Sequence, residues 1–424
     1  MVRRSLRATL GLLVLLIGGA AAAQPALVMT DDKRRLEIAT LSLEYEAGQV
    51  QARVTSARGG TLEAEGTWKE GLLALQFTAH DLDAETTEPW LLRTGPLPVA
   101  SGTLAGAGTL RWKPGEPVRI EHSVTHTGGE IEWLGIRFRA PVQTQGEIIV
   151  GGGTRLKNLR VEAAEAMLGD LQFTTLNSVV QLKDKQVRLQ KLRGRGYQAD
   201  WSGEIEIDLK EPEPRFRVAL VAEDVVGGES YEFAASEGST VARLDSVEGG
   251  FRVTGRWTGD DTWRNTLQGS GMVRVRGGEI RGSPIIPAIW HALSSRVPLL
   301  KVPRLPKLID HPNELIEGRM SFEVHDGAVH SEDVHAKTGD YVVDGSARLG
   351  FDKTIDAPLE VSLTQAGAER MITQVALPLP KSSLQLGKIP VRVTGTWSKP
   401  ETSANVERVP LSVLKMLFGY HFWP

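Results

Sequence analysis

The feature that most constrains the fold is an alternation of apolar and polar residues that runs through most of the chain. From about Leu36 onward, segments such as 41–45, 73–77 and 205–209 carry an apolar residue at every second position. Side chains alternate across a β-strand, so this period predicts strands with one apolar and one polar face. Glycine-containing turns separate about 22 such segments, mostly by loops short enough for hairpins. The sequence therefore predicts a mainly β protein built from an elongated, twisted antiparallel sheet.

A weak internal repeat supports this prediction. The segments 251–257 (FRVTGRW) and 391–397 (VRVTGTW) match at five of seven positions. Because few helices are expected, the apolar face of the sheet needs another cover. It is either closed by folding into two packed sheets, or left as the lining of a curved groove or taco-like half-barrel.

An open groove would be lined by the alternating apolar residues. Such a lining needs no motif, since burying an acyl chain gains about 0.8 kcal/mol per methylene on any continuous apolar surface. The residues expected to line it are Leu41, Leu43, Leu73, Leu75, Phe77, Ile205, Ile207, Leu209, Phe251, Val253, Val273, Val275, Phe322, Val324, Val361, Leu363, Val391 and Val393.

Two apolar stretches interrupt the alternation. The first predicts a helix at 284–297, with Ser283 as N-cap and Pro284 as its first residue. The second is the apolar tail at 403–424, with a further short helix. Both suit a plug or a membrane contact, while a lid over a β core explains the pattern equally well. The expected contact residues are Ile285, Ile286, Ile289, Trp290, Leu293, Leu414, Leu417, Phe418, Phe422 and Trp423.

The N-terminus has the pattern of a secretory signal peptide. Arginines at positions 3, 4 and 7 precede an apolar run that ends in small residues at Ala21–Ala23. The run is about 14 residues, shorter than the roughly 20 that cross a bilayer. Residues 1–23 are therefore expected to be cleaved on secretion across the inner membrane, with an uncleaved inner-membrane anchor as the alternative. The chain contains no cysteine, which excludes disulfides.

Composition and motifs argue against several classes of function. The formal net charge of −3 leaves no basic excess to neutralise a phosphate backbone, so nucleic acid is not an expected partner. The sequence contains no phosphate-binding loop, zinc-protease helix or dinucleotide fingerprint, and Gly269–Gly271 is not a nucleophile elbow. Neither an enzymatic activity nor a cofactor is expected.

Histidines with nearby aspartates form the one candidate metal site. His325, His330 and His335 lie close to Asp326 and Asp333 in the sequence. However, a five-residue spacing on strands places successive histidines on opposite faces, and an aspartate–glycine pair at 326–327 suits a hairpin turn. No metal is predicted there.

Two other groups of polar residues are weighed in the N-terminal half. His122 and His126 share a strand face, but lie about 13 Å apart at ~3.3 Å per residue, too far to chelate one zinc ion. Asp81, Asp83 and Glu85 offer carboxylates for glycoside hydrolysis, but no aromatic sugar platform accompanies them. We expect neither group to form a catalytic or metal site.

The C-terminal half shows a recognisable order of elements. A strand, a glycine turn and an apolar helix entry follow one another at 269–287. Strands with an aspartate–glycine turn follow at 320–363, and a strand with a basic-proline exit at 389–401. Over residues 245–402 this order resembles the C-terminal region of the AsmA-like family, whereas residues 30–244 share only the strand pattern. The expected segments are a signal peptide at 1–23, an N-terminal β-groove region at 30–244, an AsmA-like region at 245–402 and an apolar tail at 403–424.

The resemblance implies a repeating β-groove protein of the bacterial envelope, related to AsmA and TamB. It implies a periplasmic location, a phospholipid or other acyl lipid as ligand, membrane contact, envelope protein partners, and a role in lipid transport between membranes or outer-membrane biogenesis. Members of the family usually keep an N-terminal membrane anchor, whereas this N-terminal segment is expected to be cleaved. This chain is also short for the family. Two alternatives stay open: a structural scaffold or assembly factor with closed β cores, and a carbohydrate-binding or carbohydrate-acting β protein.

Overall fold

The structure is a computed structural model, and the account below is confined to the residues that it describes. These residues are 27–31, 34–56, 59–84, 99–133, 136–151, 154–168, 171–196, 199–224, 231–234, 241–258, 261–281, 285, 288–289, 291–292, 313–367, 369–370, 387–396 and 399–407.

The described residues fall into two compact units. The first contains the residues up to Gly196 together with Ser202–Pro214, and the second contains residues 199–201 together with those from Arg215 onward. The strand β15 (Ala199–Asp208) is divided between the two units. The other strands of the first unit are β1 (Leu27–Asp31), β2 (Arg34–Glu46), β3 (Gln49–Ser56), β4 (Thr61–Lys69), β5 (Leu72–Asp83), β6 (Val99–Ala100), β7 (Thr103–Trp112), β8 (Val118–Thr127), β9 (Glu130–Trp133), β10 (Ile136–Val150), β11 (Thr154–Leu168), β12 (Leu171–Phe173), β13 (Thr175–Lys183) and β14 (Gln186–Gly196).

The second unit is also made almost entirely of strands. Its elements are β16 (Arg215–Asp224), β17 (Tyr231–Ala234), β18 (Val241–Arg256), the 3-10 helix η1 (Asp261–Thr266), β19 (Gln268–Arg281), β20 (Asn313–His325), β21 (Ala328–Thr338), β22 (Tyr341–Gly350), β23 (Thr354–Leu363), β24 (Ile389–Thr396) and β25 (Lys399–Ala404).

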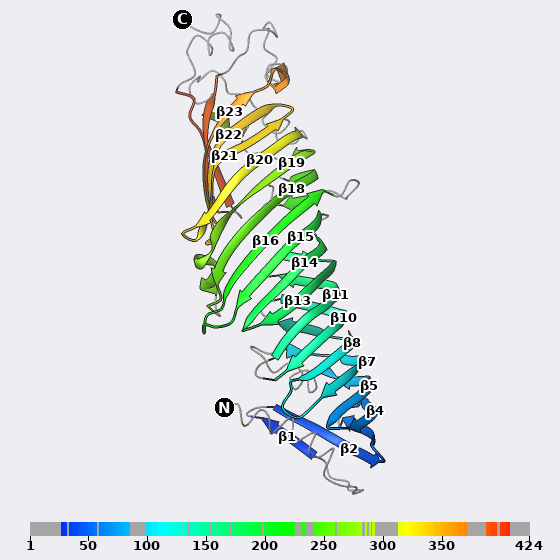
Figure 1. Cartoon of the computed structure of the whole chain (residues 1–424). Coiled ribbons are helices and arrows are strands. Elements are labelled where there is room, and N and C mark those ends of the chain that lie inside the picture. The colour runs from blue at the N-terminus through cyan, green and yellow to red at the C-terminus, as the bar shows by residue number, and fades with distance from the viewer. Residues whose placement is uncertain are drawn as a thin grey trace, which may run out of the picture. The chain divides into compact units, whose positions relative to one another are not determined.

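Within each unit, successive long strands pair side by side in an antiparallel meander (Figure 1). In the first unit the order is β1, β2, β3, β4, β5, β7, β8, β10, β11, β13, β14. In the second unit it is β16, β18, β19, β20, β21, β22, β23, β24, β25. The short strands β6, β9, β12 and β17 pair alongside these long strands.

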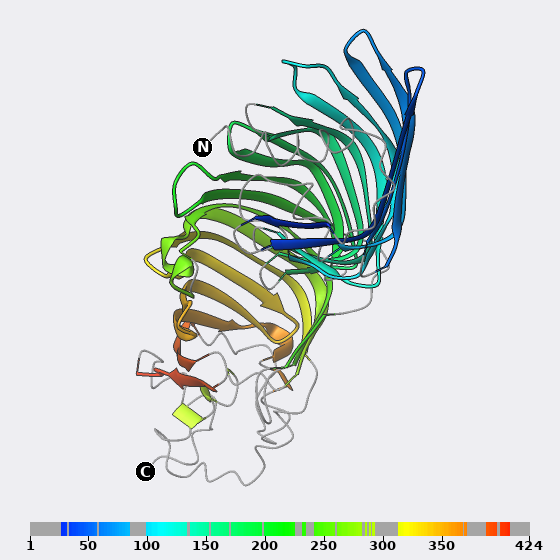
Figure 2. The ribbon, with the colours of Figure 1, turned by 90° about the horizontal axis from the view of Figure 1, so that it is seen from below.

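This topology gives the pairing of the strands within each unit. Each unit is one continuous antiparallel sheet, and within a unit its strands do not separate into two packed sheets. Among the described strands, β1 pairs only with β2 and β25 only with β24, so the sheet is not closed into a barrel. Figure 2 shows that the strands of both units bend along their length. The predicted fold class, mainly β and antiparallel with very little helix, is confirmed.

Turn chemistry explains why hairpins form where the sequence predicts them. Asp326 and Gly327 join β20 to β21 with φ values of 50° and 68°. Glu70 and Gly71 join β4 to β5 with φ values of 50° and 79°. Two successive residues with positive φ match the right-handed twist of the flanking strands, and glycine adopts this conformation without strain.

The helical prediction is confirmed in part. Ile285, Ala288, Ile289, His291 and Ala292 are helical, within the predicted range 284–297. The proposed N-cap, the end of that helix and the whole tail from residue 408 lie outside the described residues. Short helical turns at 365–367 and 369–370, and η1, were not predicted from the sequence.

The predicted boundary between the two β regions differs from the structural division. It was placed at 244/245, where the resemblance begins, and this point lies inside β18. The compact units instead divide near residue 215.

Candidate functional site

The register of the second unit brings the predicted lining residues of β18, β19 and β20 onto one face. Phe251 pairs with Gly271, which pairs with Phe322. Residues directly opposite each other in a ladder share a face, and so do residues two positions apart. Val253, Val273, Val275 and Val324 therefore lie on the same face as this row.

The same face continues across β22, β23 and β24. Val361 pairs with Val343 on one side and with Ile389 on the other. Val391 pairs with Leu359, and Val393 pairs with Ala357. Since Leu363 lies two residues from Val361, every lining residue predicted from the second unit belongs to this one apolar face.

In the first unit, the ladder register again collects the predicted residues on one face. One row runs from Leu43 through Ala52 and Ala64 to Phe77. Leu75 and Leu73 lie two and four residues from Phe77 along the same strand.

The remaining predicted residues of this unit follow the same pattern. Leu41 pairs with Val54 in the ladder between β2 and β3. In β15, Ile205 and Ile207 alternate with Glu206, whose carboxylate lies 3.2 Å from the Arg188 guanidinium on the opposite face. Leu209 follows β15, and its N–H donates to the Lys185 carbonyl at 2.8 Å.

Exposure divides these residues into two groups. Five neighbouring side chains of the second unit are partly exposed, and we call them the β18–β20 strip: Phe251, Val253, Val273, Val275 and Phe322. Leu43, Phe77, Leu209, Leu363 and Val393 are also partly exposed. Leu73, Leu75, Ile205, Ile207, Val324, Val361 and Val391 are buried.

Glycines on the apolar face make room for aromatic rings. A Cβ atom on Gly271 would overlap the Phe322 ring, and one on Gly108 would overlap the Phe77 ring. Each phenylalanine therefore lies over a glycine of a neighbouring strand. Sequence reasoning missed these pairs because they depend on cross-strand register, although the phenylalanine and glycine positions were visible.

The opposite face of each sheet is charged. In the second unit, Arg276 lies 3.1 Å from Glu248, and Arg392 forms two hydrogen bonds of 2.9 Å with Asp356. The hydrogen bond from Arg392 lowers the pKa of the Asp356 carboxyl. These pairs are exposed to solvent and contribute little to stability, but they keep this face polar.

The histidines weighed as a candidate metal site are arranged differently from the sequence prediction. His325 and His330 lie on the same face and stack, with ring centroids 4.1 Å apart and planes 1° apart, so the expectation of opposite faces was wrong. The turn at Asp326–Gly327 reverses the chain between them. His330 therefore pairs opposite Glu323 and lies on the same face as His325. His335 instead contacts Asp344, with 2.7 Å between Nδ1 and Oδ1. Among the described residues, no group of three or more histidine, aspartate or glutamate side chains is arranged to hold a metal.

His122 and His126 share a strand face, as predicted, and it is the apolar one. His122 lies between Gly108 and Gly146, and His126 is only 2% exposed. The Nε2 atom of His126 lies 2.5 Å from the Ser101 carbonyl oxygen, while the Nδ1 atoms of both rings are buried without a hydrogen-bond partner. Burial lowers the pKa of both imidazoles.

Two of the three carboxylates weighed for glycoside hydrolysis lie among the described residues. Asp81 has a φ of 50° and lies in a bulge of β5, and Asp83 pairs with Thr103 in the ladder. Glu85 lies outside the described residues.

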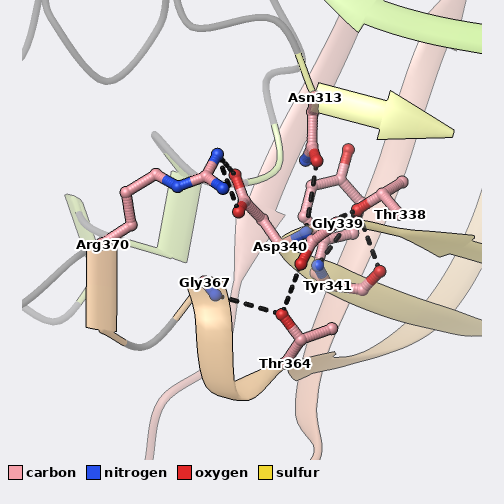
Figure 3. Close-up of polar contacts among 8 residues, drawn as sticks. All are labelled: Asn313, Thr338, Gly339, Asp340, Tyr341, Thr364, Gly367 and Arg370. Atoms are coloured by element: carbon pink, nitrogen blue, oxygen red, sulfur yellow. Dashed lines mark hydrogen bonds and ion pairs between the residues drawn. The ribbon is translucent and has the colours of Figure 1, made fainter. Parts of the chain in front are cut away.

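A polar network links the turn between β21 and β22 to the helical turn after β23 (Figure 3). Asp340, in the turn between β21 and β22, forms an ion pair with Arg370 at 3.0 Å. Its backbone N–H donates to the Asn313 side chain at 3.2 Å. The Thr364 hydroxyl donates to the Gly339 carbonyl at 2.6 Å and accepts from the Gly367 N–H at 3.0 Å. These bonds join strand ends to a helical turn. Their role is structural, because they link each side chain to a backbone group or to an oppositely charged side chain.

An aromatic cluster at the end of β18 was also missed. Trp257 and Trp263 stack at 6.1 Å with planes 7° apart, and Phe216 packs edge-on against both. Arg264 lies 5.7 Å from the Trp263 ring. The cluster depends on η1, which the sequence pattern did not predict.

The predicted membrane contacts can be placed only in part. Ile285 is partly exposed and Ile289 is buried. The other predicted contact residues, Ile286, Trp290, Leu293, Leu414, Leu417, Phe418, Phe422 and Trp423, lie outside the described residues. No helix within the described ranges combines the length and apolar character needed to cross a membrane.

Comparisons with known proteins add no relative. No protein-family model, no curated protein and no solved structure matches this chain.

Proposed function

We propose that this protein binds the acyl chains of phospholipids or other lipids on the apolar faces of its sheets. The observation that carries the proposal is the arrangement of the apolar side chains. Within each unit they collect on one face of a single sheet, and in the β18–β20 strip they stay partly exposed to solvent. Contiguous exposed apolar surface is found at protein and membrane interaction sites and in ligand-binding grooves.

The proposed mechanism is shielding without chemistry. Each methylene that leaves water for the strip contributes about 0.8 kcal/mol, and no individual side chain is required. Lipid headgroups would remain in water beside the sheet. Together with the signal-peptide pattern and the resemblance to AsmA-like proteins, this supports a role in the bacterial envelope, in lipid transport between membranes or in outer-membrane biogenesis. The protein would need no cofactor and would not act as an enzyme.

Lipid content tests this proposal directly. The full chain is purified from envelope membranes in mild detergent, and bound molecules are identified by native mass spectrometry and lipid extraction. We expect several phospholipids per chain. A lipid-free, monodisperse protein would contradict the proposal.

Charge substitutions on one strand give a sharper test. In the Val273→Asp/Val275→Asp variant, a carboxylate would have to lose its water under the acyl chain, so bound lipid should fall by about tenfold. The matched control is Arg274→Asp, which introduces the same residue between these positions on the polar face. The control should retain its lipid, and both variants should keep their strand signal in circular dichroism. Equal lipid loss in both would exclude the strip as the binding surface.

A second candidate function is a scaffold, and one observation favours it. Along β14 and β15 the apolar face is closed, since Val187 is 0%, Leu189 1% and Ile205 2% exposed. That part of the first unit is a packed core that needs no ligand. If the lipid-free outcome were found, an envelope scaffold would be the better description.

A further inference from the structure

A depression on the polar face of the first unit is separate from the apolar face. It has a volume of about 500 Å³ and lies over β3, β4, β5 and β7. Seven of its lining side chains are polar: Gln49, Gln51, Glu65, Thr67, Gln76, Thr109 and Arg111.

The ladder register explains how these side chains come together. Gln51 pairs with Glu65, which pairs with Gln76, which pairs with Thr109, so one polar row crosses all four strands. The neighbouring row contains Ala74, between Thr67 and Arg111.

A short side chain among long ones creates the hollow. The methyl group of Ala74 lies between Thr67 and Arg111 across the strands and next to Gln76 along β5. The other lining residues, Val50, Gly66, Leu75 and Leu110, lie on the apolar face by their register and contribute only backbone to the depression.

The polar lining side chains are open to hydrogen bonds from a ligand. None of the seven forms a side-chain hydrogen bond or ion pair with another described residue. Elsewhere on this face, charges pair across strands: Arg53 lies 3.4 Å from Glu63, and Glu147 accepts from Arg119 at 3.2 Å and Lys157 at 3.4 Å. The depression therefore gathers seven polar side chains whose hydrogen-bonding groups are open to a ligand.

We propose that this depression binds a neutral polyhydroxylated ligand, a short oligosaccharide. Each glutamine amide offers both a donor and an acceptor, which suits neighbouring hydroxyl groups that themselves donate and accept. Glu65 and Arg111 carry opposite charges, so the site has no net charge to attract a phosphate or another anion. The volume lies within the roughly 300–1,000 Å³ of small-molecule sites.

The experiment is a titration of the full chain with three uncharged probes: maltotriose, cellotriose and chitotriose. Binding is followed by isothermal calorimetry and saturation-transfer NMR. We expect saturable binding of at least one probe. The affinity should be about tenfold weaker in Gln51→Ala/Gln76→Ala, because two amides that each donate and accept hydrogen bonds are lost.

The matched control is Gln143→Ala/Gln145→Ala on β10. These two glutamines are likewise exposed, lie on the polar face of the same unit and stand outside the depression. The control should bind like the unaltered chain. The proposal is overturned if no probe binds up to about 20 mM, if both double variants lose binding equally, or if inorganic phosphate binds more tightly than the sugars. None of these outcomes depends on lipid binding, so the two proposals are tested separately.

Discussion

His122 and His126 are two imidazoles on the apolar face of the first unit. Burial lowers the pKa of both imidazoles, whereas in the unfolded chain each titrates near 6.5. Below that pH the unfolded chain binds more protons than the folded one, so stability is complete above about pH 6.5 and falls as the pH drops. We expect a loss of up to roughly 1.4 kcal/mol per pH unit for each histidine. Urea unfolding at several pH values between about 7.5 and 5 measures it.

The His122→Gln/His126→Gln variant isolates this effect. Glutamine retains a donor for the Ser101 carbonyl but does not titrate, so the pH dependence should flatten even if the stability at neutral pH is lower. Substituting the exposed His80 by glutamine controls for the loss of an imidazole outside the apolar face. If the double variant kept the slope of the unaltered chain, the buried histidines would not be its source.

At the scale of elements, the network around Asp340 fastens the helical turn after β23 to the strand ends. Thr364 is its central group, because its hydroxyl caps the turn at Gly367 and also bonds Gly339. Thr364→Val should therefore lower the free energy of unfolding by about 1–2 kcal/mol, measured by urea denaturation. The control is Thr394→Val on β24, whose hydroxyl makes no hydrogen bond with another described residue. It should change stability by less than about 0.5 kcal/mol, and an equal loss in both variants would remove the special role of Thr364.

The elements also show which parts of the structure local sequence could predict. The faces of Val273, Val275 and their counterparts follow from alternation within one strand, so the sequence was sufficient. His325 and His330 were predicted on opposite faces because the two-residue period of a strand was applied across the turn that separates them. The alternation starts again after that turn. The Phe322–Gly271 contact and the polar depression around Ala74 depend on which residues pair across strands. This cross-strand register is fixed when the strands assemble into the sheet, so the sequence of a single strand does not reveal it.

At the scale of the whole molecule, the net charge of −3 and the motif-free apolar faces favour a ligand held by its hydrocarbon part. Binding should then depend on acyl length. Two added methylenes contribute about 1.6 kcal/mol, so the dissociation constants of saturated fatty acids with 10, 12 and 14 carbons should fall about 15-fold at each step.

Salt distinguishes this mechanism from recognition of the headgroup. Screening weakens contacts between exposed charges, whereas apolar burial persists. The chain-length series, measured by displacement of a fluorescent fatty acid at about 0.05 and 0.5 M sodium chloride, should therefore keep its slope. In Val273→Asp/Val275→Asp the affinities should fall for every length, because the surface itself is altered. Affinity that ignored chain length but weakened with salt would instead mean that charged groups hold the lipid and that the apolar face serves packing alone.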